Sequence, residues 1–196
     1  MPDFPHTMTL KMLLPRCWIL LVATVMAAPV AVADDSLLLS GFESPLGREW
    51  KHTTRAEIVP FAAETAPDKV KAGEGSARWQ NLDLNKWISL AVSPTDWSSY
   101  GSLAVWIRSE TANGQKINLV VSAPREAGGQ GYYIHQLSVD WTGWKHVVVP
   151  LSAFKPNRSP APWSRVEGLR LTAGGWGADP MSDSVLHLDE LRLLLR

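Results

Sequence analysis

The chain of 196 residues fits one domain, or a smaller domain behind a leader. Its 19 basic and 19 acidic residues balance and form no basic tract, which argues against nucleic acids and anionic membranes as partners. Ten tryptophans are the unusual feature of the composition. Tryptophan builds cores, but it also offers a flat apolar face for stacking on ligands.

Residues 1–33 have the pattern of an export signal. Two basic residues, Lys11 and Arg16, precede the apolar stretch Cys17–Ala28, and small residues follow up to Ala33. We expect cleavage near Ala33 and a secreted or periplasmic mature protein. The alternative is a membrane anchor, but the apolar stretch is shorter than the about 20 residues that cross a bilayer.

The rest of the chain shows no catalytic signature. Cys17 is the only cysteine and lies in the leader, so the mature chain has no disulfide, thiolate metal site or cysteine nucleophile. His52, His135, His146 and His187 form no metal-binding spacing, and no G-x-S-x-G motif occurs. The acidic residues fall mostly in turns rather than as the facing pair that a glycosidase needs. We therefore expect a protein that is not an enzyme.

Residues 36–196 form one predicted domain in which apolar and polar residues alternate between turn signals. The predicted strands, in chain order, are Leu37–Glu43, Ala56–Ala63, Ser76–Asp83, Asn85–Val92, Ser102–Ser109, Lys116–Ser122, Tyr132–Val139, Lys145–Pro150, Val166–Thr172 and Val185–Leu193. One helical turn, Asp96–Tyr100, is predicted with Asp96 as its N-cap. Short strands at regular spacing predict an all-β, two-sheet antiparallel jelly-roll β-sandwich, with a barrel as the lesser alternative.

Three stretches go beyond this pattern: 96–109, 139–154, and 157–177 with its glycine-flanked Trp176; the chain then closes on the L-x-L-D-E-L strand 186–191. In this order they resemble the galactose-binding-domain-like jelly rolls. They are most similar to the carbohydrate-binding-module-like domains found beside heparinase II/III-type polysaccharide lyases and beside glycoside hydrolases. The resemblance implies a non-catalytic domain that binds a polysaccharide or oligosaccharide.

Candidate ligand-binding residues follow from strand alternation. If Leu103 and Val105 fill the core, Trp106 points outward, and an aromatic ring beside a guanidinium suits a sugar. Alternation along the other predicted strands likewise places side chains with planar hydrogen-bonding groups on an outer surface. The candidates are Trp106, Arg108, Asn118, Tyr132, Gln136, Arg170 and Trp176. The alternatives are an ordinary solvated sheet face, a Trp106 covered by a loop and a Trp176 that folds back as a plug.

Glu43 ends the first predicted strand, and Asp189 lies in the last. The resemblance implies that these strands are neighbours and that a structural calcium ion is often held there. Carboxylates, with carbonyls from the turn Lys71–Gly75, would be suitable hard ligands. The alternative is that these carboxylates accept hydrogen bonds from backbone amides.

The sequence thus predicts a secreted, non-catalytic carbohydrate-binding domain, with an acidic polysaccharide among the candidate ligands. The mature form has no expected membrane partner, and a polysaccharide-degrading enzyme could act beside it in trans. A protein-interaction or envelope-assembly sandwich is the alternative, and a polysaccharide lyase is a third.

Overall fold

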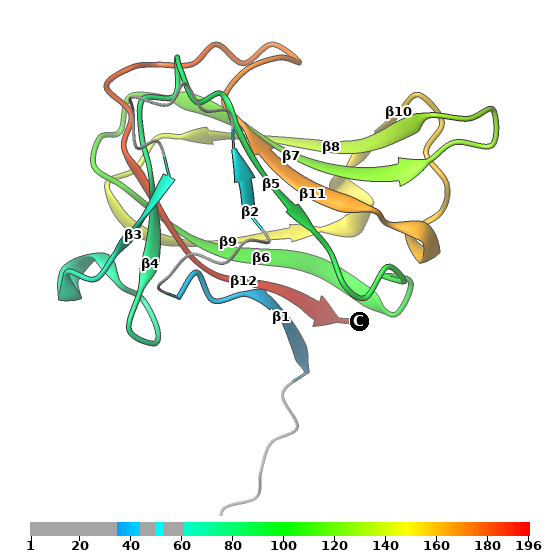
Figure 1. Cartoon of the computed structure of the whole chain (residues 1–196), viewed down its shortest axis with the longest axis horizontal. Helices are drawn as coiled ribbons and strands as arrows, with labels where there is room; N and C mark the ends of the chain where they lie inside the picture. The colour runs from blue at the N-terminus through cyan, green and yellow to red at the C-terminus, as the bar shows by residue number, and fades with distance from the viewer. Residues whose placement is uncertain (1–34, 44–49, 53–60) are drawn as a thin grey trace, which may run out of the picture. The chain divides into compact units, whose positions relative to one another are not determined.

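The structure is a computed structural model, and it describes residues 35–43, 50–52 and 61–196. Residues 34–196 form one compact unit built from two antiparallel sheets that lie face to face (Figure 1). The predicted leader, residues 1–33, lies outside the described residues, as does most of the predicted strand Ala56–Ala63. In the described part of the chain, no helix is long and apolar enough to cross a membrane.

Sheet 1 has the strand order β3-β4-β12-β6-β9, and β1 pairs with β12. Its strands are β1 (Ser36–Ser40), β3 (Phe61–Glu64), β4 (Ser76–Trp79), β6 (Tyr100–Ser109), β9 (Gly143–Pro150) and β12 (Leu186–Leu195). The first and last strands are therefore neighbours, as the resemblance implied, because Ser36 pairs with Leu194.

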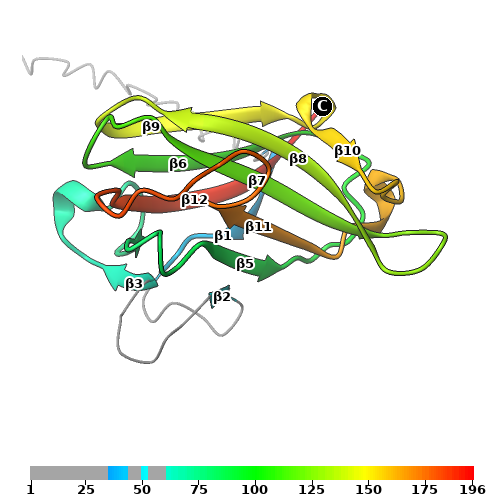
Figure 2. The same cartoon turned by 90° about the horizontal axis from the view of Figure 1, so that it is seen from above.

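Sheet 2 has the strand order β10-β8-β7-β11-β5-β2. Its strands are β2 (Trp50–His52), β5 (Trp87–Ala91), β7 (Gln115–Pro124), β8 (Gln130–Val139), β10 (Lys155–Asn157) and β11 (Gly168–Thr172). Figure 2 looks down on this sheet, where β8, β7, β11 and β5 lie side by side. The sequence missed β2 and β10, which are only three residues each.

The core forms where the alternating apolar side chains of the two sheets meet. Leu103, Val105 and Ile107 of sheet 1 are at most 1% exposed, and Leu119 and Leu171 of sheet 2 are fully buried. Burying one such side chain contributes about 1.5–3 kcal/mol. This packing confirms the predicted all-β sandwich. Because one face of each strand fills the core, the residues between these positions must lie on the outer faces.

The segment after Asp96 differs from its prediction. It makes one hydrogen-bonded turn, from Tyr100 N to Trp97 O at 3.0 Å, and no helix. Asp96 still caps it, because its Oδ1 accepts hydrogen bonds from the N–H and O–H of Ser98. The helical segments described are three short 3₁₀ turns, at Pro67–Lys69, Leu151–Ala153 and Trp163–Arg165. The fully buried Trp97 fills this end of the sandwich, where it stacks on Trp163.

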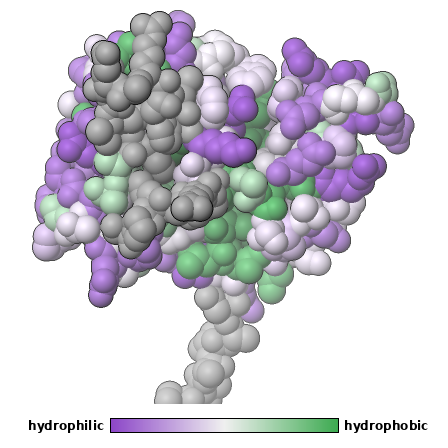
Figure 3. Space-filling view, in the orientation of Figure 1, coloured by the Kyte–Doolittle hydropathy of each residue, from purple (hydrophilic) through white to green (hydrophobic). Residues whose placement is uncertain are grey.

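The surface is uneven in polarity. Figure 3 shows hydrophilic side chains gathered over the β7–β8 hairpin and β10, and an apolar area near β1 and the end of β12. Leu38 on β1 and Leu195 on β12 are 44% and 47% exposed. The apolar area thus belongs to sheet 1, whereas the hollows described next belong to sheet 2.

Candidate functional site

The outer face of sheet 2 carries five of the seven residues that the sequence predicted as ligand-binding. Asn118 lies on β7, Tyr132 and Gln136 on β8, Arg170 on β11, and Trp176 on the loop that follows β11. Strand register brings them together, because Asn118 pairs with Gln136 on one side and with Thr172, two residues after Arg170, on the other. The sequence prediction of one outer surface therefore holds for these five residues.

Trp176 is the most exposed aromatic side chain of this face, with 44% of its surface accessible. Its φ is 49°, and Gly175 and Gly177 beside it have φ values of 83° and 79°. Glycine adopts positive φ without a steric penalty, so the two glycines let the chain turn sharply on both sides of the indole. An edge-on contact with Tyr132, at 6.0 Å between ring centroids, supports the indole over the sheet.

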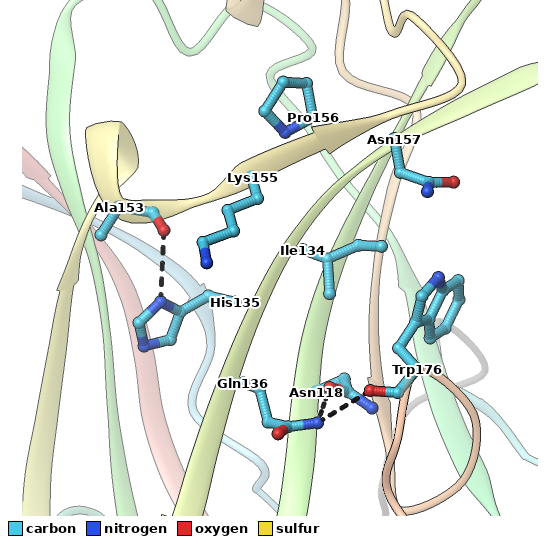
Figure 4. Close-up of a pocket in the computed structure, with 9 residues that line it drawn as sticks. All are labelled: Asn118, Ile134, His135, Gln136, Ala153, Lys155, Pro156, Asn157 and Trp176. Carbon is cyan, nitrogen blue, oxygen red and sulfur yellow. Dashed lines mark hydrogen bonds between the residues drawn. The ribbon is translucent and has the colours of Figure 1, made fainter.

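Asn118 and Gln136 hold the Trp176 loop from below. The buried Asn118 donates its Nδ2–H to Gly175 O at 2.9 Å, and Gln136 donates its Nε2–H to Trp176 O at 3.1 Å. Gln136 also donates to Asn118 Oδ1 at 3.0 Å, which links the two amides (Figure 4). Both side chains are therefore occupied with the loop backbone. They position Trp176, and both also line the hollow beside it, where Gln136 is exposed.

Trp176 separates two hollows. The first, of about 450 Å³, is lined by Ile134, Asn157 and Lys155, whose side chain extends from β10 toward β8 (Figure 4). The second, of about 290 Å³, is lined by Lys86, Trp87, Arg170 and neighbouring residues. Because Trp176 lines both hollows, its indole forms the wall between them.

Arg170 is held in place by an aromatic partner. Its guanidinium carbon lies 4.8 Å from the ring centroid of Trp87 on the neighbouring strand. Arg170 also lines a third hollow, of about 240 Å³, together with Lys51, Tyr132 and Glu167. A stacked guanidinium keeps its N–H groups in one plane, available for carboxylate or hydroxyl groups.

Trp87, Lys155 and Lys51 were not among the predicted site residues. Alternation in Asn85–Val92 could have found Trp87, because Ile88 and Leu90 are buried and place Trp87 on the outer face. Lys155 and Lys51 lie on strands of three residues, too short to show a period.

Trp106 and Arg108 do not join this face, which corrects the prediction of one shared surface. Both lie on β6, so they belong to the outer face of sheet 1. The Trp106 ring stacks on His146 at 4.6 Å between centroids, and Lys71 Nζ lies 4.1 Å from the centroid of the same ring. Arg108 makes an ion pair with Glu110 at 2.6 Å. These contacts occupy the two groups that the sequence had assigned to sugar binding.

Glu43 and Asp189 both contact the turn 71–74, as the calcium prediction required. Their contacts, however, are to amide groups: Asp189 Oδ2 accepts hydrogen bonds from the N–H of Lys71 and Ala72, and Glu43 Oε2 accepts one from Glu74. Asp189 Oδ1 accepts the N–H of Glu190. Desolvation by burial raises the pKa of Asp189.

These amide donors occupy both oxygens of Asp189 and one oxygen of Glu43. Within the described ranges, no group of three or more His, Cys, Asp or Glu side chains is placed to hold a metal ion. The contacts correspond to the alternative, in which the two carboxylates anchor a turn. Calcium stays a prediction from the sequence.

Comparison with known proteins gives the family. The model of the family 11 carbohydrate-binding domain matches residues 50–171. Among solved structures, the family 11 carbohydrate-binding module of a cellulosomal cellulase from Clostridium thermocellum is similar. It is 14% identical, with a TM-score of 0.61, over 84% of this chain and 96% of that one. No curated protein matches the chain.

Two further structures share the fold. The Clostridium thermocellum family 11 module in complex with a β-1,3-1,4-mixed-linked tetrasaccharide is 12% identical over 81% of this chain and 95% of that one, with a TM-score of 0.59. An exo-β-agarase is 11% identical over 81% of this chain and 24% of its own length, also with a TM-score of 0.59. The family match spans more than half of the chain and includes all of sheet 2 except Thr172, the last residue of β11. The chain therefore belongs to the family 11 carbohydrate-binding domains, and it is a non-catalytic carbohydrate-binding module.

Proposed function

We propose that the outer face of sheet 2 is the glycan-binding surface and that Trp176 is its central stacking platform. The observation that carries this is an exposed indole on a loop whose backbone is bonded by two side-chain amides, and Trp176 lines a hollow on each side. The C–H face of a pyranose ring packs on such an indole, while Asn157 and Arg170 in the hollows offer hydrogen bonds to hydroxyl groups.

The preferred ligand is an acidic polysaccharide. The three hollows are lined by four basic side chains, Lys51, Lys86, Lys155 and Arg170, and by two acidic ones, Glu167 and Asp179. The whole chain has a formal net charge of zero, so this face is more basic than the molecule as a whole. A neutral β-glucan is the second candidate, because a structural neighbour is solved in complex with a mixed-linked tetrasaccharide.

Calorimetric titration with polygalacturonate, alginate, mixed-linkage β-glucan and agarose oligosaccharides tests both the proposed binding face and the proposed preference for an acidic ligand. We expect affinities between millimolar and micromolar, because the contact area is small and wet. Trp176→Ala should weaken binding about tenfold or more without unfolding the domain. Trp144→Ala, which removes a tryptophan from sheet 1, is the matched control. Equal binding by both variants and the parent would show that the glycan binds elsewhere.

We also propose that the mature domain is secreted or periplasmic and presents glycan to a degrading enzyme in trans. The export-signal pattern of residues 1–33 and the absence of a catalytic signature in the sequence support this. Amino-terminal sequencing of protein recovered from the exported fraction checks it, and a chain that still begins at Met1 would contradict cleavage near Ala33.

A further inference from the structure

Three of the basic side chains lie on one line across sheet 2. Lys155 on β10 pairs with Ile134 on β8, and Ile134 pairs with Val120 on β7. The line continues through hydrogen-bonded neighbours to three more strands. Val120 pairs with Arg170 on β11, Arg170 with Ser89 on β5, and Ser89 with Lys51 on β2. We call Lys155, Arg170 and Lys51 the cation row.

Register makes the row straight. Paired residues lie directly opposite each other, so the row runs perpendicular to the strands, and its side chains share the face opposite the buried Leu119 and Leu171. Strands in a sheet are about 4.8 Å apart. Lys155 and Arg170 are therefore about 14 Å apart, and Arg170 and Lys51 about 10 Å.

Trp176 stands in the middle of this line. It lines the hollow of Lys155 on one side and the hollow of Arg170 on the other, and Arg170 also lines the hollow that contains Lys51. A ligand that stacks on the indole and extends along the row thus meets one cation before the indole and two after it.

The three cations are available for a ligand. Among the residues that the structure describes, no carboxylate oxygen lies within 4.0 Å of Lys155, Arg170 or Lys51. By contrast, Arg108 on the opposite sheet and Lys69 in the 3₁₀ turn Pro67–Lys69 both pair with Glu110. All three side chains of the cation row line hollows of the face that holds Trp176.

We propose that the cation row binds three carboxylates of an extended polyuronate chain that crosses the strands over Trp176, with about three sugar residues between the first two carboxylates and about two between the next. The inference rests on the proposed function and adds the direction of the chain, its length and the residues that select its charge. One sugar residue of an extended chain is about as long as one strand spacing, so the row accommodates about five or six residues.

A ladder of uronate oligosaccharides, from the disaccharide to the octasaccharide, tests the length. Calorimetry with the full chain should show affinity rising with each added residue up to about the hexasaccharide and then levelling off. The neutral counterparts of the same lengths should bind less tightly. Raising the salt concentration should weaken only the uronate series, because salt screens exposed charges.

Variants test the row itself. Lys155→Gln and Lys51→Gln should each weaken uronate binding about threefold to tenfold and leave neutral-glycan binding within twofold. Arg170→Gln should weaken both, because Arg170 also serves glycan hydroxyl groups, and it should weaken uronate binding more. Lys71→Gln, in the turn 71–74 and over the ring of Trp106, removes the same charge from a side chain outside the row and should bind like the parent. Circular dichroism confirms that each variant is folded.

The outcomes separate the two proposals. If the row variants bind uronates like the parent while Trp176→Ala loses binding, the cation row is wrong and the glycan face stands. If affinity levels off at the disaccharide, the chain does not run along the row. If Trp176→Ala binds every glycan normally, the proposed function itself fails.

Discussion

Trp106 and Trp176 both lie on outer faces of the sandwich, but of the two only Trp176 leaves its ring exposed. Strand alternation correctly placed Trp106 on an outer face, but alternation does not say which groups cover that face. His146 and Lys71, distant from Trp106 in sequence, close over its ring. The exposed position of Trp176 could be predicted, because its flanking glycines exclude a regular strand and place the indole on a sharp turn.

Asn118 gives a prediction about positioning. Asn118→Asp keeps the acceptor for Gln136 but replaces the N–H that donates to Gly175 O with a carboxylate oxygen. We expect glycan affinity to fall because the loop carbonyl is repelled and Trp176 loses its support. We also expect a loss of about 1–2 kcal/mol in the free energy of unfolding.

Calorimetry and denaturant melts of Asn118→Asp, with Ser138→Ala on the same face of β8 as the control, measure the two effects. Tryptophan fluorescence should report a more solvated indole in the Asn118 variant alone. Unchanged affinity would mean that the loop holds its conformation without the amide.

Among the elements, long strands were predictable and short ones were not. The buried strand β6 was expected from its alternation, and its observed bounds extend the prediction by two residues at the start. By contrast, β10 consists of Lys155, Pro156 and Asn157, which carry no apolar pattern, and only its pairing with β8 defines it. Lys155 lies on this strand and lines the first hollow beside Trp176. That hollow therefore depends on the pairing of β10 with β8, which the local sequence does not encode.

Gly131 keeps β10 and its connecting loop close to β8. A Cβ at this position would lie 2.5 Å from Pro160 Cα and 2.9 Å from Arg158 O, both backbone atoms that cannot rotate away. Gly131→Ala should therefore displace this loop and lower the free energy of unfolding by about 1–3 kcal/mol. It should also weaken glycan binding, because Asn157 lines the first hollow and directly precedes this loop.

Gly174→Ala is the comparison, since a Cβ there would meet only the Lys86 side chain at 3.5 Å. Thermal melts of the two variants should differ by several degrees. Equal melting temperatures would mean that the 158–160 segment adapts without cost.

At the scale of the whole molecule, an ionic cluster around Glu110 joins strands β6 and β12 of sheet 1 to the 3₁₀ turn Pro67–Lys69. Glu110 Oε1 lies 2.6 Å from both Lys69 Nζ and Arg108 NH1, and 3.0 Å from Nε2 of the buried His187. The Arg108 guanidinium beside the Glu110 carboxylate is the main cause that lowers the pKa of Glu110 to about 2. Desolvation lowers the pKa of His187, whose Nδ1 has no hydrogen-bond partner among the described residues.

Both shifts predict that acid destabilises the fold. Below the ordinary His pKa of about 6.5, the unfolded chain takes up a proton that folded His187 resists, so stability falls as pH drops from 7.5 to 5.5. The contribution of Glu110 is present above its ordinary pKa of 4.5 and is lost as pH falls toward 2.

Urea melts between pH 7.5 and pH 3 measure the free energy of unfolding and check the effects of both His187 and Glu110. His187→Gln should flatten the stability profile between pH 7.5 and 5.5. Glu110→Gln should be destabilised at pH 7, and its gap to the parent should narrow below pH 4.5. A gap that stays constant down to pH 3 would contradict a charge-dependent role for Glu110.

The pairing of β1 with β12 has a practical consequence. Leu195 N–H donates to Asp35 O at 2.9 Å, so the two ends of the described domain adjoin each other on sheet 1, in the layer opposite the hollows. A fluorescent label or surface tether fused after Arg196 would therefore point away from the ligand. The domain could be immobilised in one orientation, with every molecule on a sensor chip presenting Trp176 to the sample.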